Sequence, residues 1–432
     1  MDSESIRKII GRKQGVQIEV ISADSQTESL KIENKEFKGS EISHSSNVMI
    51  RCIYRNKGSI VSGTLIDESD LDKMIDNAIS LAKTAGSNDF QKYLYRKRYS
   101  IKERLVYRKP ADENFVNRLI KDVNGIRKDP KLYSLNSIAS ESKVRFYGAN
   151  SFGAAVEGYK EMATLETEAI AKDGINQGTG SEYSESHGLN GIDIQKNLSS
   201  ALKIAKSMIN AKAAPTCTGQ LLLDPKAAIS FVNFFTDSLD GEDIYKKKSF
   251  LSGMKNKQVA SKIVDIKEEV YMRDSLYNRR FDDELMPTSS KSIVKGGKLK
   301  TYLHSIYSAE KMHEKPTGNN FMTSKGGISA TNLVVKPGKL DFNDMISKVK
   351  RGIYMIDTGD RPNESTGDLS AMVSVGYYVE NGEIKYPVKE TLVGANMLGM
   401  MRNVIRVGSD KLSMMGTSSP SLLIDGIKIS GK

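Results

Sequence analysis

The sequence predicts an α+β fold with two domains and largely antiparallel sheets, and three observations support this prediction. The chain has 432 residues, 38% hydrophobic and 27% charged, a composition typical of a globular protein long enough for two domains. Runs of β-forming residues are separated by turns rather than by regular crossover helices, which favours antiparallel pairing. An Ala-Ala-Pro junction at 213–215 precedes a half with many short β segments. We therefore predict an N-terminal α/β domain with an antiparallel meander over 1–214 and a β-rich C-terminal domain over 215–432.

Helices of the first domain are predicted where apolar residues recur every three or four positions. Asp67 is placed to cap one of them, because its carboxylate can accept hydrogen bonds from the first free amides. Gly86 is placed to end the same helix. The predicted helices cover 1–12, 68–85, 113–126 and 193–210.

Strands of the first domain are predicted where apolar and polar residues alternate, over 16–20, 30–32, 47–66 and 131–172. A turn at Asn56-Lys57-Gly58 is expected to join two strands, with Gly58 available for a positive φ. The polar, glycine-rich stretch 174–191 is predicted to be a surface loop. Its Gly178 and Gly180 do not form a phosphate-binding loop, because no third glycine and no helix follow.

The second domain is predicted to contain many short strands and two helices. The main helix covers 227–239, and a second helix lies near 342–349. The predicted strand segments are 221–223, 259–266, 332–335, 353–356, 372–380 and 421–429.

The stretch 280–320 carries the densest group of potentially functional residues. It begins with three adjacent carboxylates, Asp282, Asp283 and Glu284, and continues into a basic hairpin over 291–300 and a short helical pattern. Three acids together suggest metal binding or acid–base chemistry. A solvated turn or an ion-paired hinge is the alternative interpretation.

Several short motifs follow one another in a fixed order along the chain. They are PTCTGQLLLDP (215–225), FDDE (281–284), KGGKLKTYLHS (295–305), SAEK (308–311), PTGNN (316–320), TNLVVKPG (331–338), GIYMIDTGD (352–360), TGDLSAMVSVGYYVENGEIKYPV (366–388) and PSLLIDGIKISG (420–431). This series resembles the TldD/PmbA family, whose members are labelled modulators of DNA gyrase and regarded as metalloproteases. The resemblance covers nearly the whole chain and departs from the family pattern at Leu285, where a glycine usually follows the acids.

The resemblance implies that proteolytic relatives bind a metal through an HExxxH helix, which this chain does not retain. The following Leu-Asp-Gly-Glu at 239–242 fixes the register and places Val232 and Asp237 at the histidines and Asn233 at the general base. Valine has no lone pair, and an amide cannot accept a proton from water at neutral pH. The relatives also carry a late cysteine ligand, and 411–420 contains no cysteine. We therefore expect no metal and no catalytic residue in this chain.

The remaining histidines and cysteines offer no other catalytic arrangement. The four histidines, at positions 44, 187, 304 and 313, are each expected to be surface or hydrogen-bonded residues. Cys52 and Cys217 stand alone, which favours a reducing cytoplasm without a disulfide framework. Asp368 belongs to a motif shared by active and inactive relatives, so we expect it to serve the fold or a dimer surface. Asp282, Asp283, Glu284 and Asp368 are thus expected to be substrate-binding or structural residues.

The resemblance implies a TldE/PmbA-like, non-catalytic subunit of a cytoplasmic complex that degrades or trims unfolded peptides. Its partner would be a TldD-like, HExxxH-bearing chain holding zinc, although a homodimer is also possible. Two alternatives remain: a self-sufficient homodimeric metal-dependent hydrolase using the acids at 282–284, and a DNA-gyrase-associated modulator. Nucleic-acid binding is not expected, because the net charge of +11 is dispersed and the densest basic run is only 246–248. No apolar run is long enough to span a membrane.

Overall fold

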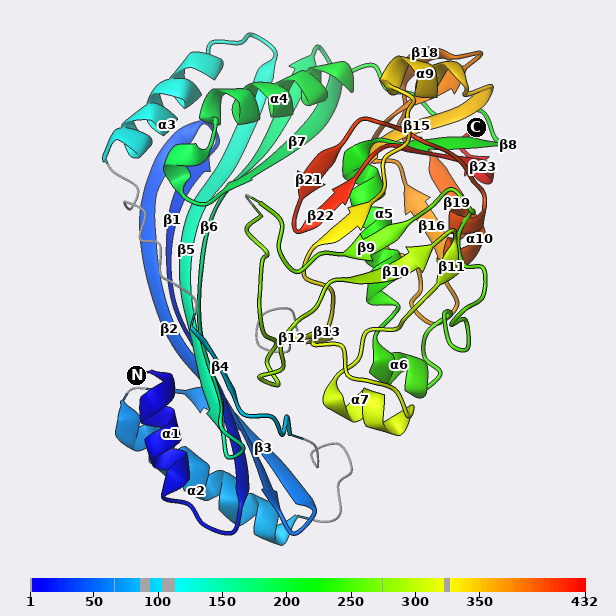
Figure 1. Cartoon of the computed structure of the whole chain (residues 1–432). Coiled ribbons are helices and arrows are strands. Elements are labelled where there is room, and N and C mark those ends of the chain that lie inside the picture. The colour runs from blue at the N-terminus through cyan, green and yellow to red at the C-terminus, as the bar shows by residue number, and fades with distance from the viewer. Residues whose placement is uncertain (1, 66, 86–93, 103–112, 274, 322–326) are drawn as a thin grey trace.

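The structure is a computed structural model, and it describes residues 2–65, 67–85, 94–102, 113–273, 275–321 and 327–432. The α+β fold with predominantly antiparallel sheets is confirmed. A long curved sheet forms the first half of the chain, and two smaller sheets packed around a helix form the second (Figure 1).

The N-terminal sheet has the strand order β3-β2-β1-β5-β6-β4, with β7 also paired to β6. All pairs are antiparallel except β4 with β6. The two strand segments expected at 16–20 and 30–32 are parts of one long strand, β1. The bounds are β1 Gln17–Glu33, β2 Glu36–Tyr54, β3 Lys57–Thr64, β4 Tyr99–Lys102, β5 Leu132–Asn150, β6 Ala154–Asp173 and β7 Asn176–Ser186.

Helices cover the two ends of this sheet and bury its apolar residues. Helices α1 (Ser3–Gly11) and α2 (Glu68–Thr84) pack on one end, and α3 (Glu113–Ile126) and α4 (Ile194–Ser207) pack on the other (Figure 1). The predicted cap is confirmed, because the Asp67 carboxylate accepts hydrogen bonds from the amides of Ser69 and Asp70. The expected end of α2 at Gly86 lies outside the described residues.

The predicted surface loop at 174–191 is wrong, because most of it is strand β7. Its two glycines allow α4 to lie directly against the strand. A Cβ on Gly178 would stand 2.2 Å from the carbonyl oxygen of Ala205, and one on Gly180 would stand 2.3 Å from that of Ala201. The glycines of this polar stretch are therefore explained by the close approach of a helix to a strand, and they do not indicate a loop.

The turn between β2 and β3 also differs from the prediction. Arg55 and Asn56 occupy its two central positions and both have positive φ, 45° and 65°. Two consecutive residues of positive φ are the geometry of a tight hairpin turn, whose twist matches that of the flanking strands. Gly58 consequently lies in strand β3 and is not required for the turn.

The C-terminal half packs an eight-stranded and a six-stranded sheet around helix α5 (Pro225–Asp237), with the main hydrophobic cluster between them. The eight-stranded sheet has the order β16-β19-β23-β8-β15-β17-β18, with β20 paired to β23, and the six-stranded sheet has the order β11-β10-β9-β14-β22-β21. The strand predicted at 259–266 is wrong except for its last residue, which begins β9.

The remaining elements of this half are short. The described helices are α6 Gly241–Tyr245, α7 Ile306–Lys311, α9 Phe342–Ser347 and α10 Met397–Arg402. The strands are β8 Cys217–Leu223, β9 Ile266–Glu268, β10 Lys291–Lys295, β11 Lys298–Leu299, β12 Asn320–Phe321, β13 Gly327–Ile328, β14 Leu333–Val335, β15 Arg351–Asp357, β16 Asp368–Met372, β17 Val375–Glu380, β18 Glu383–Pro387, β19 Leu392–Asn396, β20 Val404–Val407, β21 Leu412–Met414, β22 Thr417–Ser419 and β23 Leu422–Ser430.

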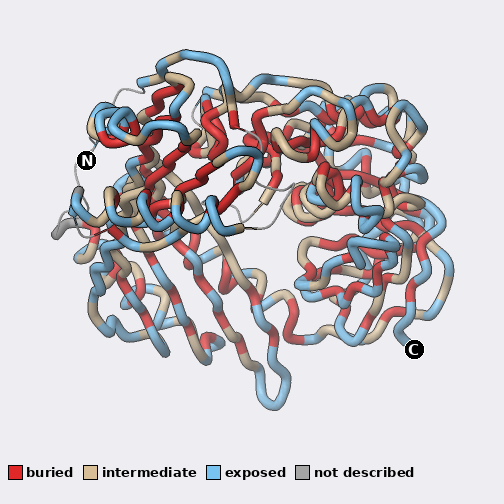
Figure 2. The backbone as a smooth tube through the Cα atoms, turned by 90° about the horizontal axis from the view of Figure 1, so that it is seen from below, coloured by how far each residue is buried: buried red, intermediate tan, exposed pale blue. Residues whose placement is uncertain are grey.

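The concave face of the long N-terminal sheet is turned toward the C-terminal half (Figure 1). The hairpin formed by β21 and β22 projects from the C-terminal half toward this sheet. Seen from below, buried segments run through both halves, and each half carries its own core (Figure 2). The space between the concave sheet and the hairpin is where the candidate site lies.

Candidate functional site

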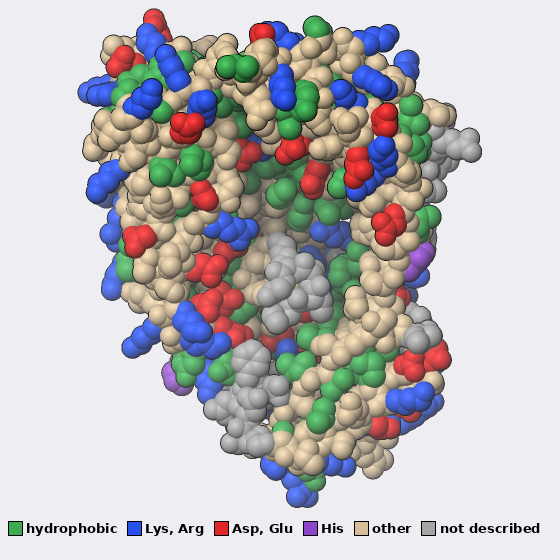
Figure 3. Space-filling view, turned by 180° about the vertical axis from the view of Figure 1, so that it is seen from behind, with side chains coloured by type: hydrophobic (Ala, Val, Ile, Leu, Met, Phe, Trp, Pro, Cys, Tyr) green, Lys and Arg blue, Asp and Glu red, His purple; other side chains and the backbone are tan. Residues whose placement is uncertain are grey.

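The candidate site is a cleft between the two halves, and a hollow is visible at this position from behind (Figure 3). A cavity of about 440 Å³ forms its centre. Its walls come from the end of β7, from the loop around Tyr277, and from the β21–β22 hairpin. The cleft therefore combines residues that are more than 200 positions apart in the sequence.

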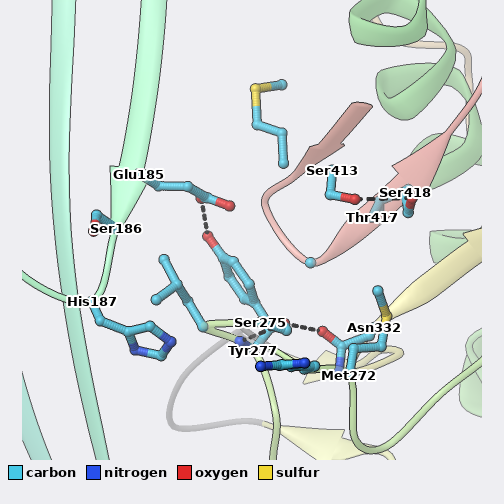
Figure 4. Close-up of a pocket in the computed structure, with 14 residues that line it drawn as sticks. Glu185, Ser186, His187, Met272, Ser275, Tyr277, Asn332, Ser413, Thr417 and Ser418 are labelled. Carbon is cyan, nitrogen blue, oxygen red and sulfur yellow. Dashed lines mark hydrogen bonds between the residues drawn. The ribbon is translucent and has the colours of Figure 1, made fainter. Parts of the chain in front are cut away.

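Glu185 at the end of β7 joins the two halves through its carboxylate. Its oxygens accept hydrogen bonds from the Tyr277 hydroxyl at 2.9 Å and from the Met415 amide at 3.0 Å. The Tyr183 hydroxyl donates a third hydrogen bond at 3.0 Å. Figure 4 shows Glu185 and Tyr277 meeting at one side of the cavity. Burial, followed by the negative charge of Glu185, raises the pKa of the Tyr277 hydroxyl, which therefore stays protonated and acts as a donor.

Two further hollows adjoin this cavity along the concave sheet. One has a volume of about 240 Å³ and shares Tyr277 with the central cavity. The other, of about 480 Å³, is lined by Tyr183, Met415 and Lys226 at the start of α5. The tip of the β21–β22 hairpin lies between the central and the third hollow, because Met414 and Gly416 line the former and Met415 lines the latter. We refer to the space that contains the three hollows as the groove.

The three positions of the degenerate metal motif lie in different environments. Val232 is completely buried in the main core cluster, whereas Asp237 is exposed at the last residue of α5. Asn233 faces β22, where its side-chain oxygen accepts a hydrogen bond from the Thr417 hydroxyl at 2.5 Å. The two histidine-equivalent positions are five residues apart, which separates them by roughly 140° around an α-helix.

These residues do not fit a zinc ion. A catalytic zinc site takes three protein nitrogen, sulfur or oxygen ligands and keeps one position open for water. Val232 offers none, and the Asn233 oxygen is already bonded to Thr417. Over the residues that the structure describes, no group of three or more His, Cys, Asp or Glu side chains could hold a metal ion.

The carboxylates of 282–284 point to three different sets of partners. Asp282 accepts hydrogen bonds from the amides of Glu284, Met286 and Asn320, and thus holds its own turn together. Burial raises the pKa of Asp282 well above its usual range, and the charge of Glu284 adds to this shift. Asp283 pairs with Arg279 at 2.5 Å. The arrangement is that of a buried, ion-paired turn.

Glu284 belongs to a buried ionic cluster that crosses between the two halves. One Arg51 guanidinium nitrogen lies 3.3 Å from a Glu284 oxygen and 3.4 Å from a Glu19 oxygen. The other Glu284 oxygen accepts a hydrogen bond from the Ile306 amide at 2.7 Å. Burial raises the pKa of Glu19 to about 7, because the opposing effect of Arg51 only partly compensates for desolvation and Glu284 adds repulsion.

Leu285 keeps the backbone conformation that a glycine would adopt. Its φ is 52°, in the left-handed region that is unfavourable for a leucine. The Tyr99 hydroxyl donates a hydrogen bond to its carbonyl oxygen, and its side chain lies against Gly148 in the concave sheet. The departure from the family pattern thus changes the side chain at the domain contact and leaves a left-handed turn in place.

The histidines do not come together at one point. His187 lines the central cavity, and His304 is buried and hydrogen-bonded to Ser308 at 3.1 Å. Burial lowers the pKa of His304 to about 4, so its imidazole is neutral at pH 7. His44 and His313 are exposed.

Asp368 and the two cysteines lie away from the central cavity. The Asp368 carboxylate accepts a hydrogen bond from the Asn396 side chain at 3.0 Å, which joins the paired strands β16 and β19. Cys52 is buried and Cys217 is partly buried, and both thiols are free. Burial raises the pKa of the Cys52 thiol to about 11, which makes it a poor nucleophile.

The residues that line the central cavity were not identified from the sequence. Glu185 and Tyr277 line the cavity, and the Met415 amide donates a hydrogen bond to Glu185; the three residues come from unrelated segments, and none of them belongs to a recognisable motif. The polar composition of 174–191, which includes Glu185, is the available signal in the sequence, but the same composition also favours a surface loop. Across the described part of the chain, no helix is long and apolar enough to cross a membrane.

The comparisons with known proteins agree with the fold. The chain is 28% identical over 264 residues to the Metalloprotease PmbA homolog of Buchnera aphidicola subsp. Baizongia pistaciae, which covers 61% of this chain and 57% of that relative. It is 25% identical over 389 residues to the homolog of subspecies Acyrthosiphon pisum, which covers 87% and 84%.

Solved structures show the same architecture. A protein of Thermotoga maritima described as a modulator of DNA gyrase superposes with a TM-score of 0.89 at 24% identity and covers 99% of both chains. TldE from Thermococcus kodakarensis superposes with a TM-score of 0.87 at 18% identity and covers 99% of this chain and 100% of that chain.

Two family models match the sequence itself. The PmbA/TldA metallopeptidase domain 1 matches residues 18–82, which include β1, β2 and β3. The PmbA/TldA metallopeptidase C-terminal domain matches residues 216–431, half of the chain, and this range contains α5 and the β21–β22 hairpin. The chain therefore belongs to the PmbA/TldD family of metallopeptidases.

Proposed function

We propose that this chain is the non-catalytic, TldE-like subunit of a TldD/TldE-type metalloprotease that degrades or trims unfolded peptides. The observation that supports this proposal most directly is the state of helix α5. Val232 is buried in the core and has no ligand atom, the Asn233 side-chain oxygen accepts a hydrogen bond from Thr417, and Asp237 is the only carboxylate at the three positions. The metal and the general base would then come from a HExxxH-bearing partner, and the complex would act in the cytoplasm.

The groove between the halves offers a place for an extended peptide. Among the described strands, β21 pairs only with β22, so one edge of β21 remains open beside the central cavity. An open edge binds an extended chain through main-chain hydrogen bonds, which require no particular peptide sequence. A subunit of this kind would hold and orient unfolded substrates of varied sequence.

The proposal predicts that the purified chain alone does not cleave unstructured peptides. Co-expression with a HExxxH-bearing paralogue should yield a complex that elutes as one species from a sizing column. That complex should cleave a fluorogenic unstructured peptide in a chelator-sensitive manner. Robust chelator-sensitive cleavage by the homogeneous chain alone would instead favour a self-sufficient hydrolase, and failure of the two chains to co-elute would refute the partner role.

A second prediction concerns the restoration of the family motif in α5. The variant Val232→His/Asn233→Glu/Asp237→His supplies only two nitrogen ligands, whereas catalytic zinc takes three protein ligands. Val232→His also places a polar ring in the buried core, which should lower thermal stability. We expect the variant to retain less than one equivalent of zinc after dialysis and to remain inactive. One tightly bound zinc with peptide cleavage would show that a third ligand is already in place.

A further inference from the structure

The cavity of about 240 Å³ beside Tyr277 has the features of a binding site for an apolar side chain. Its lining includes the aromatic residues Phe146, Tyr159, Tyr277, Phe281 and Phe321. A dry cavity of about 150 Å³ is large enough to hold benzene. The cavity therefore has room for a leucine-sized or phenylalanine-sized side chain.

Two cations line the same cavity, and only one of them is neutralised by an adjacent acid. Arg279 pairs with Asp283 at 2.5 Å, and its guanidinium lies 4.4 Å from the ring centre of Phe146 and 5.0 Å from that of Phe321. The Lys160 ammonium lies over the Tyr277 ring, 4.5 Å from its centre. Within the described residues, no carboxylate forms an ion pair with Lys160.

The environment of Lys160 favours an incoming anion. Burial, followed by the positive charge of Arg279, lowers the pKa of the Lys160 ammonium, and the charge of Glu185 opposes this shift. A carboxylate placed beside Lys160 would offset the cost of keeping a half-buried ammonium charged. Because Lys160 and Met162 project from the same face of β6, the anion and the apolar body of a ligand would be received side by side.

We propose that this cavity binds the C-terminal residue of a peptide, with its apolar side chain among the rings and its α-carboxylate on Lys160. The inference rests on the proposed peptide-binding role of the groove. The cavity shares Tyr277 with the central cavity, so a chain anchored here continues toward the open edge of β21. The anchor would fix the direction of the peptide, which main-chain hydrogen bonds to a strand edge do not fix by themselves.

The test is direct binding to the full chain, measured by fluorescence anisotropy with an N-terminally labelled unstructured peptide. The peptide ending in leucine with a free carboxylate should bind about 10- to 100-fold more tightly than its C-terminal amide, the range expected for one hydrogen bond to a charged group. A peptide ending in serine should also bind more weakly. N-acetyl-leucine should compete with the labelled peptide, and N-acetyl-leucinamide should not.

Lys160→Met should abolish the difference between acid and amide, whereas Lys160→Arg should retain most of it. Lys172→Met is the matched control, because Lys172 lies on the same strand and over the Tyr133 ring but does not line the cavity. Equal binding of acid and amide by the wild-type chain would overturn the inference, and this comparison requires no variant. If the complex with the paralogue still cleaves peptides in that case, the inference fails while the proposed function stands. If the complex does not cleave and no peptide binds, both fail.

Discussion

Replacing Arg51 by methionine should lower the free energy of unfolding by about 3–5 kcal/mol at pH 8. The guanidinium is the positive centre between Glu19 and Glu284, and all three side chains are at most 8% exposed. Methionine fills a similar volume without the charge. Removing one partner from a buried ion pair leaves the other charges uncompensated in a medium of low polarity, and this loss typically costs about 3–5 kcal/mol. The midpoint and slope of urea unfolding, followed by circular dichroism, measure the change.

The matched control removes all three charges together. In the variant Glu19→Gln/Arg51→Met/Glu284→Gln, no charge is left buried without a partner, and the amide oxygen of residue 284 can still accept from Ile306. This variant should recover most of the stability lost in Arg51→Met, because a neutral replacement of a buried ion cluster is often close to neutral in stability. A loss below about 1 kcal/mol in Arg51→Met would contradict the prediction, since it would mean that water reaches the cluster.

The second large effect is a pH dependence of stability that originates at Glu19. In the native state the Glu19 pKa is raised to about 7, from 4.5 as its ordinary value. Between these two values the native chain holds a proton that the unfolded chain releases, so stability falls as pH rises. The loss of unfolding free energy caused by ionising the buried Glu19 is absent well below pH 4.5 and complete above pH 7, where it amounts to about 3 kcal/mol.

Glu19→Gln isolates this contribution from the other titrating groups. The difference in unfolding free energy between the variant and the wild-type chain should change by about 2–3 kcal/mol between pH 5 and pH 8, in favour of the variant at pH 8. A difference that stays constant over this range would show that Glu19 is ionised throughout. Arg51→Met should extend the dependence to higher pH, because loss of the neighbouring cation raises the Glu19 pKa further.

The residues changed in these two predictions also join the two walls of the groove. Arg51 and Glu19 belong to the concave sheet, whereas Glu284 belongs to the C-terminal half, so the cluster helps to hold the two walls together. Glu185 also joins the two walls, at the central cavity, through Tyr277 and Met415. The two walls are therefore joined by a buried ionic cluster and by the hydrogen bonds of Glu185, which are only partly buried or exposed.

The sequence by itself determined the fold class, the family and most of the regular elements. The helices are set by local patterns, and α3 begins and ends at the predicted residues 113 and 126 because its apolar face repeats over four turns. The loss of the HExxxH motif at positions 232, 233 and 237 is also evident from the sequence, because a metal ligand must supply a lone pair and valine has none. The boundary of the domains at 214 and 215 stays a prediction.

Only the tertiary structure decided what the polar residues contact. From the sequence, the acids at 282–284 are compatible with a metal site or with an ion-paired turn. The structure shows the ion-paired turn, because Arg51 of β2 pairs with Glu284 and Arg279 pairs with Asp283. Strand β7 was missed because its glycines are selected by the closeness of α4, a contact that no local pattern records. The groove depends on Glu185, Tyr277 and Met415, and these meet only because the long sheet curves around the second half (Figure 1). Helix and strand periodicity is a property of neighbours in the chain, whereas hydrogen bonds and charge pairs between distant segments depend on how the whole chain packs.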